Sequence, residues 1–286
     1  MSNDVPAPTA AEGGAYNPAV PNAARIYDYL LGGKDNFPAD RAAAEGLVKI
    51  VPDMRQRTRE NRDFLIRAVR HLADSGVRQF LDLGSGLPTG ENVHEVVHRI
   101  APDARVVYVD SDEVAVVHGR ALLARHPEGL VRMVHADVCD TAAMLAHPDV
   151  VESFDREQPV AVVMVALLHF IPEPQVRHIL DTLRTWMPPG SHVVISHAAP
   201  GQMSPEEQRE VLAVYERANM RIHGRSLEQI TAMFDGFQLT EEGVLPVSHW
   251  RPDGHLYHLD ELPRSGYFAG GVAQLAPQGT GTRASR

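Results

Sequence analysis

From residue 77 onward, the sequence alternates short, almost continuously apolar runs with longer stretches of helical spacing. The runs are rich in β-branched residues and read RQFLDL, RVVYVD, VRMVHAD, PVAVVMVALL and HVVISHAA. Such continuous runs are typical of strands that are covered on both faces. The helical stretches between them suit right-handed crossovers that join parallel strands. The alternation therefore predicts an α/β domain with a doubly wound, mostly parallel sheet.

The order of elements changes after His197. We expect one helix to begin at Ser204, within the capping box SPEE, and a second to begin at Ser226. The strand-like segments EEGVLPVSHW and SGYFAGGVAQL follow without a helix of comparable length between them. Only an antiparallel pair fits so short a connection. This Rossmann-like domain is expected to cover residues 77–276.

The segment before residue 77 is helical in pattern. NAARIYDYLL stops at paired glycines, a common helix end, and ADRAAAEGLVKIV and RQRTRENRDFLIRAVRH follow. In the last of these, arginines alternate with acids as on a solvated helix face. We expect an N-terminal helical cap over residues 17–76. Residues 1–16 and 277–286 lack periodicity and are expected to be disordered tails.

Charge and cysteine content narrow the possible partners. The formal charge is −10 and the pI is near 5.8, so most of the surface would repel a nucleic-acid backbone. The single cysteine, Cys139, excludes an internal disulfide framework and fits a reducing compartment. Neither a signal-peptide pattern nor an apolar run of about 18 residues is present. We expect a cytoplasmic protein that binds neither nucleic acid nor membrane.

The loop GSGLPTG follows the first expected strand and opens a helix. In an open α/β sheet, ligands bind outside the carboxyl ends of the strands, and glycines let the backbone approach a ligand closely. Asp82, Asp110 and Asp137 stand at the ends of three successive expected strands, so they converge on one crevice. There Asp110 is placed to accept the hydroxyls of an adenosine ribose. The alternative is a structural turn with acids that only face water.

The spacing of this loop argues against a dinucleotide. In a G-x-G-x-x-G pattern the third glycine, Gly90, falls one position late, and Pro88 removes a backbone donor. Glu91, expected in the first helical turn, would repel a pyrophosphate. S-adenosylmethionine carries a sulfonium and an ammonium but no phosphate. We therefore expect Asp82 and Glu91 to favour S-adenosylmethionine over a nicotinamide cofactor.

A zinc-like pentapeptide, HEVVH, occupies the following helix. His94, Glu95 and His98 match the H-E-x-x-H motif of zinc proteases. However, the valines and Ile100 form an apolar stripe that would pack this helix on the sheet, with the imidazoles at its edge. No later helix offers an evident third ligand. We expect no metal site here.

Six segments combine these patterns with the N-terminal helices: RIYDYLLGGKDNFPADRAAAE, FLDLGSGLPTGENVHEV, VVYVDSD, HADVCD, WRPDG and YFAGGVA. Together they closely resemble a bacterial family of S-adenosylmethionine-dependent methyltransferases, long catalogued only as a domain of unknown function. The match runs from about Asn17 to Ala276. The resemblance implies a class I, Rossmann-like fold of seven strands, the last antiparallel, with the cofactor over the Gly-rich loop. It implies no particular substrate.

The resemblance also implies a set of cofactor contacts by position. The methionine part would contact the Gly-rich loop at Gly84, Ser85 and Gly86. The adenosine would lie against the ends of the second and third strands, at Asp110, Ser111, Asp112, Asp137 and Val138. The pocket would be closed just past the fourth strand by Ala166 and Leu167.

His169, in LLHFIPE, follows the strand end that faces the transferred methyl group in this fold. A neutral imidazole there is a candidate base for an acceptor hydroxyl or amine, although a lone histidine beside apolar residues is often simply packed. In the N-terminal segment, the candidates for shaping an acceptor pocket are Tyr27, Tyr29, Lys34 and Asn36. The alternative for GGKDNF is a helix C-cap followed by a polar turn.

These expectations favour an in-line transfer of a methyl group from S-adenosylmethionine to an unidentified small molecule. Because the sulfonium is already activated, alignment can supply much of the acceleration and a base is not obligatory. A second hypothesis is a non-catalytic module that senses S-adenosylmethionine or S-adenosylhomocysteine, since it would use the same loop and acids.

Overall fold

The computed structural model describes residues 17–88, 90–123, 129–218, 220–253 and 266–276. The tails expected at 1–16 and 277–286 lie outside the described residues. The centre of the molecule is one sheet with the strand order β3-β2-β1-β4-β5-β8-β6, and the short β7 also pairs with β8. The strands are β1 (Gln79–Leu83), β2 (Arg105–Asp110), β3 (Val131–His135), β4 (Ala161–Val165), β5 (His192–Ala199), β6 (Phe237–Leu239), β7 (Leu245–Pro246) and β8 (Tyr267–Leu275).

The sheet is doubly wound, as the alternating pattern predicts. β1 pairs in parallel with β2 on one side and with β4 on the other, so the strand order reverses at β1. β8 runs antiparallel to β5 and pairs antiparallel with β6 and β7. The expected mostly parallel sheet with an antiparallel last strand is therefore confirmed. The point of reversal is where open α/β sheets form a ligand crevice.

The C-terminal strands differ in extent from the expectation. Within EEGVLPVSHW only Leu245–Pro246 is a strand, and Val247–His249 form the 3-10 helix η2. Phe237–Leu239 adds the strand β6, which the sequence pattern did not indicate. A segment of three residues is too short to show the alternation of apolar and polar residues that marks a strand. This strand can be recognised only from its pairing with β8. Among the described residues the main path of the sheet has seven strands, the expected number, and the two-residue β7 adds an eighth beside β8.

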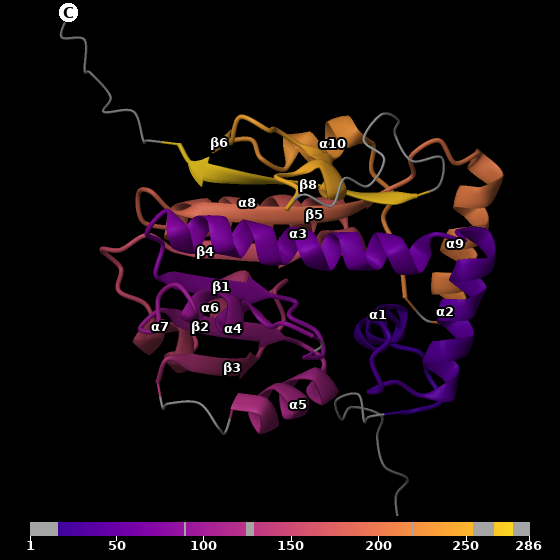
Figure 1. The fold of residues 1–286 in the computed structure, drawn as a ribbon, viewed down its shortest axis with the longest axis horizontal. Helices are drawn as coiled ribbons and strands as arrows, with labels where there is room; N and C mark the ends of the chain where they lie inside the picture. The colour runs from indigo at the N-terminus through magenta and orange to yellow at the C-terminus, as the bar shows by residue number, and fades with distance from the viewer. Residues whose placement is uncertain (1–16, 89, 124–128, 219, 254–265, 277–286) are drawn as a thin grey trace, which may run out of the picture.

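Helices cover both faces of the sheet, and each face has its own apolar core. α3, which runs across the front of the sheet in Figure 1, forms one core with α4 and α5. α6, α7 and α8 form the core on the opposite face. The helices are α1 (Ala23–Leu31), α2 (Pro38–Ile50), α3 (Met54–Asp74), α4 (Val93–His98), α5 (Glu113–Leu123), α6 (Thr141–Leu145), α7 (Pro148–Ser153), η1 (Leu168–Phe170), α8 (Glu173–Trp186), α9 (Pro205–Arg217), α10 (Leu227–Ala232) and η2.

α3 is amphipathic, but its arginines are not all solvated. Phe64 is fully buried against the sheet. Arg67 is also buried, and its guanidinium donates to the backbone oxygens of Val247 at 2.7 Å and Trp250 at 2.9 Å. The expected solvated face is therefore wrong for Arg67, and also for Arg62, which lines the cavity described below. An alternation of charges cannot show which arginine will find a backbone acceptor in a distant segment.

α1 and α2 pack with α9 at one end of the sheet (Figure 1). Ile26, Leu47 and Val214 belong to their shared apolar cluster. The helical segment 17–76 thus divides its packing, because α3 lies on the sheet while α1 and α2 do not. We call α1, α2 and α9 the cap. In the part of the chain that the structure describes, no helix is long and apolar enough to cross a bilayer.

Candidate active site

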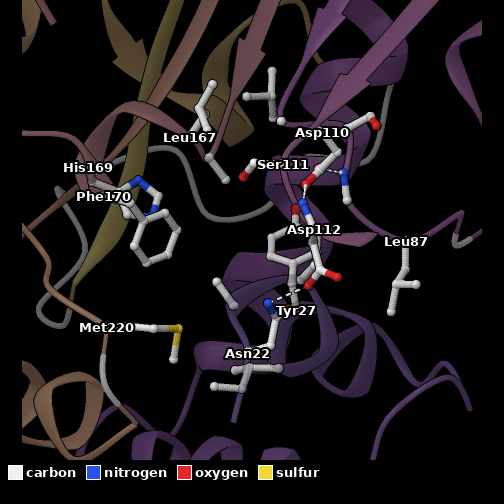
Figure 2. Close-up of a pocket in the computed structure, with 18 of the residues that line it drawn as sticks. Asn22, Tyr27, Leu87, Asp110, Ser111, Asp112, Leu167, His169, Phe170 and Met220 are labelled. Carbon is white, nitrogen blue, oxygen red and sulfur yellow. Dashed lines mark hydrogen bonds between the residues drawn. The ribbon is translucent and has the colours of Figure 1, made fainter. Parts of the chain in front are cut away.

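A cavity of about 440 Å³ lies between the carboxyl ends of the strands and the cap. Figure 2 shows Asp110, Ser111 and Asp112 on one side of it and His169, Phe170 and Met220 on the other. The side lined by strand-end residues, here called the rim end, contains Arg62, Asp82, Gly84, Ser85, Gly86, Asp110, Ser111, Asp112, Ala136 and Val138. The other side, here called the cap end, contains Ile26, Tyr27, Leu30, Met54, His169, Phe170, Tyr215, Met220, Arg221 and Phe268. The volume is in the range of small-molecule sites.

The Gly-rich loop requires its first two glycines. Gly84 and Gly86 have φ angles of 68° and 66°, in the left-handed region that L side chains rarely adopt. A Cβ atom on Gly84 would also lie 2.6 Å from Cδ1 of Leu167. Leu167 therefore packs directly on the loop, which places the turn after β4 beside the turn after β1.

Asp110 holds this loop in place. The N–H of Gly86 donates to its Oδ2 at 2.7 Å, and the N–H of Asp112 donates to its Oδ1 at 2.9 Å. Burial raises the pKa of Asp110, although these N–H groups oppose the shift. Each carboxylate oxygen can accept a second hydrogen bond, so Asp110 can fix the loop and still bind hydroxyls in the cavity.

Asp82 is the most perturbed acid of the rim end. It is 6% exposed, and burial raises its pKa to about 7, with Arg62 opposing the shift and Asp110 adding to it. Arg62 donates to the backbone oxygen of Glu91, while its Nε has no hydrogen-bond partner among the described residues. A cation placed beside Asp82 would favour its ionised form.

The role expected for Glu91 is wrong in its geometry. α4 begins at Val93 with Asn92 as its N-cap, so Glu91 precedes the helix instead of lying in its first turn. Its side chain forms an ion pair with Arg99 and does not belong to the described lining of the cavity. The argument for a cationic ligand therefore rests on Asp82 and its neighbouring acids.

Asp137 is also placed differently from the other strand-end acids. It is exposed, and its Oδ1 accepts a hydrogen bond from the N–H of Cys139 at 2.8 Å. Its neighbours Ala136 and Val138 line the cavity, whereas Asp137 is not among the described lining residues. The turn after β3 thus presents an apolar surface to the rim end.

The structure brings one of the four expected cap residues into this cavity. Tyr27 lines it, and Tyr29 instead donates its hydroxyl to Glu45 at 2.7 Å. Lys34 and Asn36 line a separate cavity of about 400 Å³ between the cap and α5. The side-chain amide of Asn36 also donates to Asp28 Oδ2 at 2.7 Å, so Asn36 stabilises the turn that GGKDNF forms after α1.

A buried hydrogen-bond chain joins Tyr27 to the end of β4. The side-chain amide of Asn61 donates to the Tyr27 hydroxyl at 2.9 Å, and Ser196 Oγ donates to Asn61 Oδ1 at 2.6 Å. The N–H of Ala166 then donates to Ser196 Oγ at 3.0 Å. Because Ala166 has a φ of 57°, this chain helps to hold a strained residue directly before Leu167.

A second link joins the cap to the rim. Asn22 is the N-cap of α1, where its Oδ1 accepts from the N–H of Arg25, and its amide nitrogen donates to Asp112 Oδ2. The sequence reasoning missed this role, although Asn before a helical run is a common N-cap signal. Asn22 therefore fixes the cap next to the ends of β1 and β2.

His169 lies in η1, directly after β4. Its side chain is 4% exposed, and Nδ1 has no hydrogen-bond partner among the described residues. Burial, together with His197 and Arg225, lowers the pKa of His169 well below its ordinary value. Arg225 also holds the turn, because its guanidinium donates to the backbone oxygens of Leu168 at 2.9 Å and Ile171 at 2.8 Å. The imidazole is thus neutral and firmly positioned at the wall of the cavity.

The histidines of the zinc-like pentapeptide are engaged in packing. His94 is buried with its Nδ1 2.7 Å from the hydroxyl of Tyr108, and Nε2 of His98 lies 2.9 Å from the backbone oxygen of Ala104. Glu95 accepts from the N–H of Asn92 and caps α4. The described residues contain no group of three side chains that could hold a metal ion.

Comparison with known proteins identifies the class of this site. Residues 11–276 match the model of a family described as S-adenosyl methyltransferase. The chain belongs to this S-adenosyl methyltransferase family. A protein of Mycolicibacterium smegmatis named as an S-adenosyl-L-methionine-dependent methyltransferase is 29% identical over 227 residues, which cover 76% of this chain and 69% of that protein.

Two solved structures of high similarity support this assignment. A protein of Thermobifida fusca named as a methyltransferase is 39% identical, with a TM-score of 0.82, over 91% of this chain and 96% of its own. A DUF574 family protein from Streptomyces avermitilis is 36% identical, with a TM-score of 0.83, over 90% and 98% of the two chains. The expected resemblance and the class I methyltransferase fold are therefore confirmed.

The cofactor of this S-adenosyl methyltransferase is S-adenosylmethionine, and the rim end fits it. Its glycines allow the left-handed backbone of the loop, and its buried acids suit a ligand that carries two positive charges. Tyr27 was expected at this cavity, but the sequence reasoning missed the other aromatic side chains of the cap end, those of Phe170, Tyr215 and Phe268. Phe170 is adjacent to His169, but Tyr215 and Phe268 come from distant segments.

Proposed function

We propose that this methyltransferase acts on a small molecule bound at the cap end, next to S-adenosylmethionine at the rim end. The continuity of the cavity is the observation that carries the proposal. The same cavity is lined by the strand-end acids and by an apolar wall formed by the cap, η1 and β8. A continuous cavity of this kind suits two molecules that must meet end to end.

The cofactor contacts follow from the arrangement of the rim end. Gly84, Ser85 and Gly86 would bind the methionine part, and Asp110 would bind the ribose hydroxyls. Ser111 and Asp112 would lie along the edge of the adenosine. Val138, whose side chain lines the cavity, would contact the adenine in place of the exposed Asp137. Ala166 and Leu167, just past β4, would close the cavity beside the cofactor.

The residues of the chain contribute by alignment and by exclusion of water. When bound, S-adenosylmethionine supplies an activated methyl group. The cap, fixed to the rim by Asn22 and to the end of β4 by the chain through Tyr27, holds the acceptor at a defined place. Fixing two reactants in this way can supply about 7–11 kcal/mol of the barrier reduction.

Calorimetry with an Asp110→Asn variant tests the proposal. We expect the affinity for S-adenosylhomocysteine to fall by about 10- to 100-fold, because the ribose loses a charged acceptor worth about 1.5–3 kcal/mol. Asp103→Asn is the matched control, since Asp103 is exposed and precedes β2, at the opposite end of the strand from Asp110. Binding of NAD but not of S-adenosylmethionine would refute the proposal. Cofactor binding without methyl transfer to any member of a broad acceptor library would indicate a sensor instead.

A further inference from the structure

The cap end of the cavity has a different electrostatic character from the rim end. Among the described lining residues, the carboxylates are Asp82, Asp110 and Asp112, and all three belong to the rim end. The charged side chain in the described wall of the cap end is Arg221, which is exposed and forms no ion pair with a described residue. A positively charged molecule would meet a cation there and no carboxylate. A neutral or negatively charged molecule would not be repelled.

The wall of the cap end is aromatic. The ring centroids of His169 and Phe170 are 4.3 Å apart, and those of Phe170 and Tyr215 are 6.1 Å apart. Phe268 also belongs to this wall, and its ring centroid lies 6.1 Å from that of His169. Met220 adds a flexible thioether that can adapt to the edge of a ligand. Such walls bind flat ring compounds by offset or edge-to-face contacts.

His169 adds a polar group to this apolar wall. Its ring lines the cavity, and its buried Nδ1 has no hydrogen-bond partner among the described residues. Leaving such a nitrogen unpaired in a buried position is unfavourable, so a ligand that supplies a hydroxyl would be favoured. His169 lines the same cavity as the Gly-rich loop, and Leu167, two residues before it, packs on Gly84 of that loop.

We propose that the methyl acceptor is a flat, largely apolar ring compound with a phenol-type hydroxyl and no positive charge, and that His169 binds this hydroxyl and receives its proton. The proposal rests on the proposed function, because it names the acceptor for the same cavity. In the transfer, the acceptor oxygen bonds to the methyl carbon while the bond from that carbon to sulfur breaks. Sulfur keeps the electron pair and becomes a neutral thioether, and the hydroxyl proton passes to the imidazole. Atoms and charge balance without another reactant.

A library of paired compounds tests the acceptor class on the unmodified protein. Each aromatic compound of one to three rings is compared as its hydroxyl, amino and aminomethyl form, with and without a carboxylate. Binding is measured calorimetrically on protein saturated with S-adenosylhomocysteine. We expect the hydroxyl forms to bind at least about tenfold more tightly than the cationic aminomethyl forms, since like charges across an interface are strongly disfavoured. Tighter binding of the aminomethyl forms, or binding of none of the hydroxyl forms, would overturn the proposal.

The same library separates the two proposals. Failure of S-adenosylhomocysteine itself to bind would refute the proposed function, whereas its binding without any hydroxyl ligand would refute only the acceptor class. Mass spectrometry of the products then locates the new methyl group. Methylation on oxygen is expected, and methylation on carbon or nitrogen of the bound hydroxyl compounds would overturn the proposal.

Variants of His169 and Arg221 test the two polar groups. His169→Gln should lower kcat for hydroxyl acceptors by about 100-fold, the lower range for general base catalysis, while affinity for S-adenosylhomocysteine stays within about threefold. His178→Gln, at an exposed position of α8, is the control. Unchanged kcat in His169→Gln would overturn the proton-accepting role.

Arg221 is tested by its effect on acceptors that carry a carboxylate. We expect the unmodified protein to prefer these acceptors by about threefold, and we expect Arg221→Gln to remove this preference. Arg217→Gln is the control and should leave the preference unchanged.

Discussion

The two ends of the cavity are built in different ways. Most of the rim end comes from the turns after β1, β2 and β3, where each residue is held by its neighbours in the sequence and by backbone hydrogen bonds such as those to Asp110. The cap end is assembled from α1, α3, η1, α9 and β8, which are far apart in the sequence. The comparison teaches that one end of a cavity can be built by short local turns while the other end depends on tertiary packing.

The largest effect is expected from a change at the contact between the two ends. Gly84→Ala would place a Cβ 2.6 Å from Leu167 and would force a left-handed residue to carry a side chain. We expect cofactor affinity to fall by about 100-fold and the free energy of unfolding to fall by about 1–3 kcal/mol. Calorimetry and denaturant unfolding measure both effects.

Gly90→Ala is the matched control for this change. Gly90 has nearly the same φ, 66°, but a Cβ there would meet no atom within 4 Å. The difference between the two variants isolates the contact with Leu167 from backbone strain. Equal effects in both variants would show that the two ends do not depend on this contact.

The pH dependence of cofactor binding tests the role of Asp82 at the rim end. Because the pKa of Asp82 is about 7, this carboxyl is mostly protonated at pH 6 and mostly ionised at pH 8. Affinity for the cationic S-adenosylmethionine should therefore rise by about tenfold between these values, and Asp82→Asn should flatten the profile. A steep profile that persists in Asp82→Asn would contradict the assignment.

Without ligand, the free energy of unfolding should fall as pH rises, whereas the affinity for the cofactor should rise. The folded-state pKa of Asp82 is raised above its ordinary value of 3.8, so the folded state binds more protons than the unfolded state between about pH 4 and 7. The free energy of unfolding therefore falls as pH rises through this interval. Asp82→Asn should lose less stability over the same interval in urea titrations.

A smaller effect is expected from loosening the link between cap and rim. Asn22→Asp keeps a good N-cap for α1 but replaces the donor to Asp112 with a second carboxylate. The loss of about 1–3 kcal/mol should appear as faster hydrogen exchange in α1, with little change in the sheet. Ser226→Asp, at the N-cap of α10, is the control. Unchanged exchange in α1 would show that packing alone holds the cap.

The smallest effect is expected at Glu91. Because its carboxylate pairs with Arg99 outside the described lining of the cavity, Glu91→Gln should change cofactor affinity by less than about twofold and stability by less than about 1 kcal/mol. Calorimetry checks this outcome. A clear loss of affinity would mean that Glu91 reaches the cofactor after all.

The sequence predicted the parts of the molecule that local patterns define. The alternation of apolar runs and helices indicated the doubly wound sheet, and the position of the Gly-rich loop after β1 indicated Gly84, Gly86 and Asp110. The cap end was mostly not predicted, because nothing in the neighbourhood of Tyr215 or Phe268 shows that they face the same space. Likewise, Tyr29 and Asn36 stand beside a glycine pair that suggests a functional loop, yet their side chains stabilise the cap.

The placement of α9 has a consequence for the diversification of these enzymes. This helix lies in the connection between β5 and β6, packs on α2 and contributes Tyr215 to the cavity. Insertions, deletions or substitutions in that connection can therefore change the cap end of the cavity without changing the sequence of the turns that form most of the rim end.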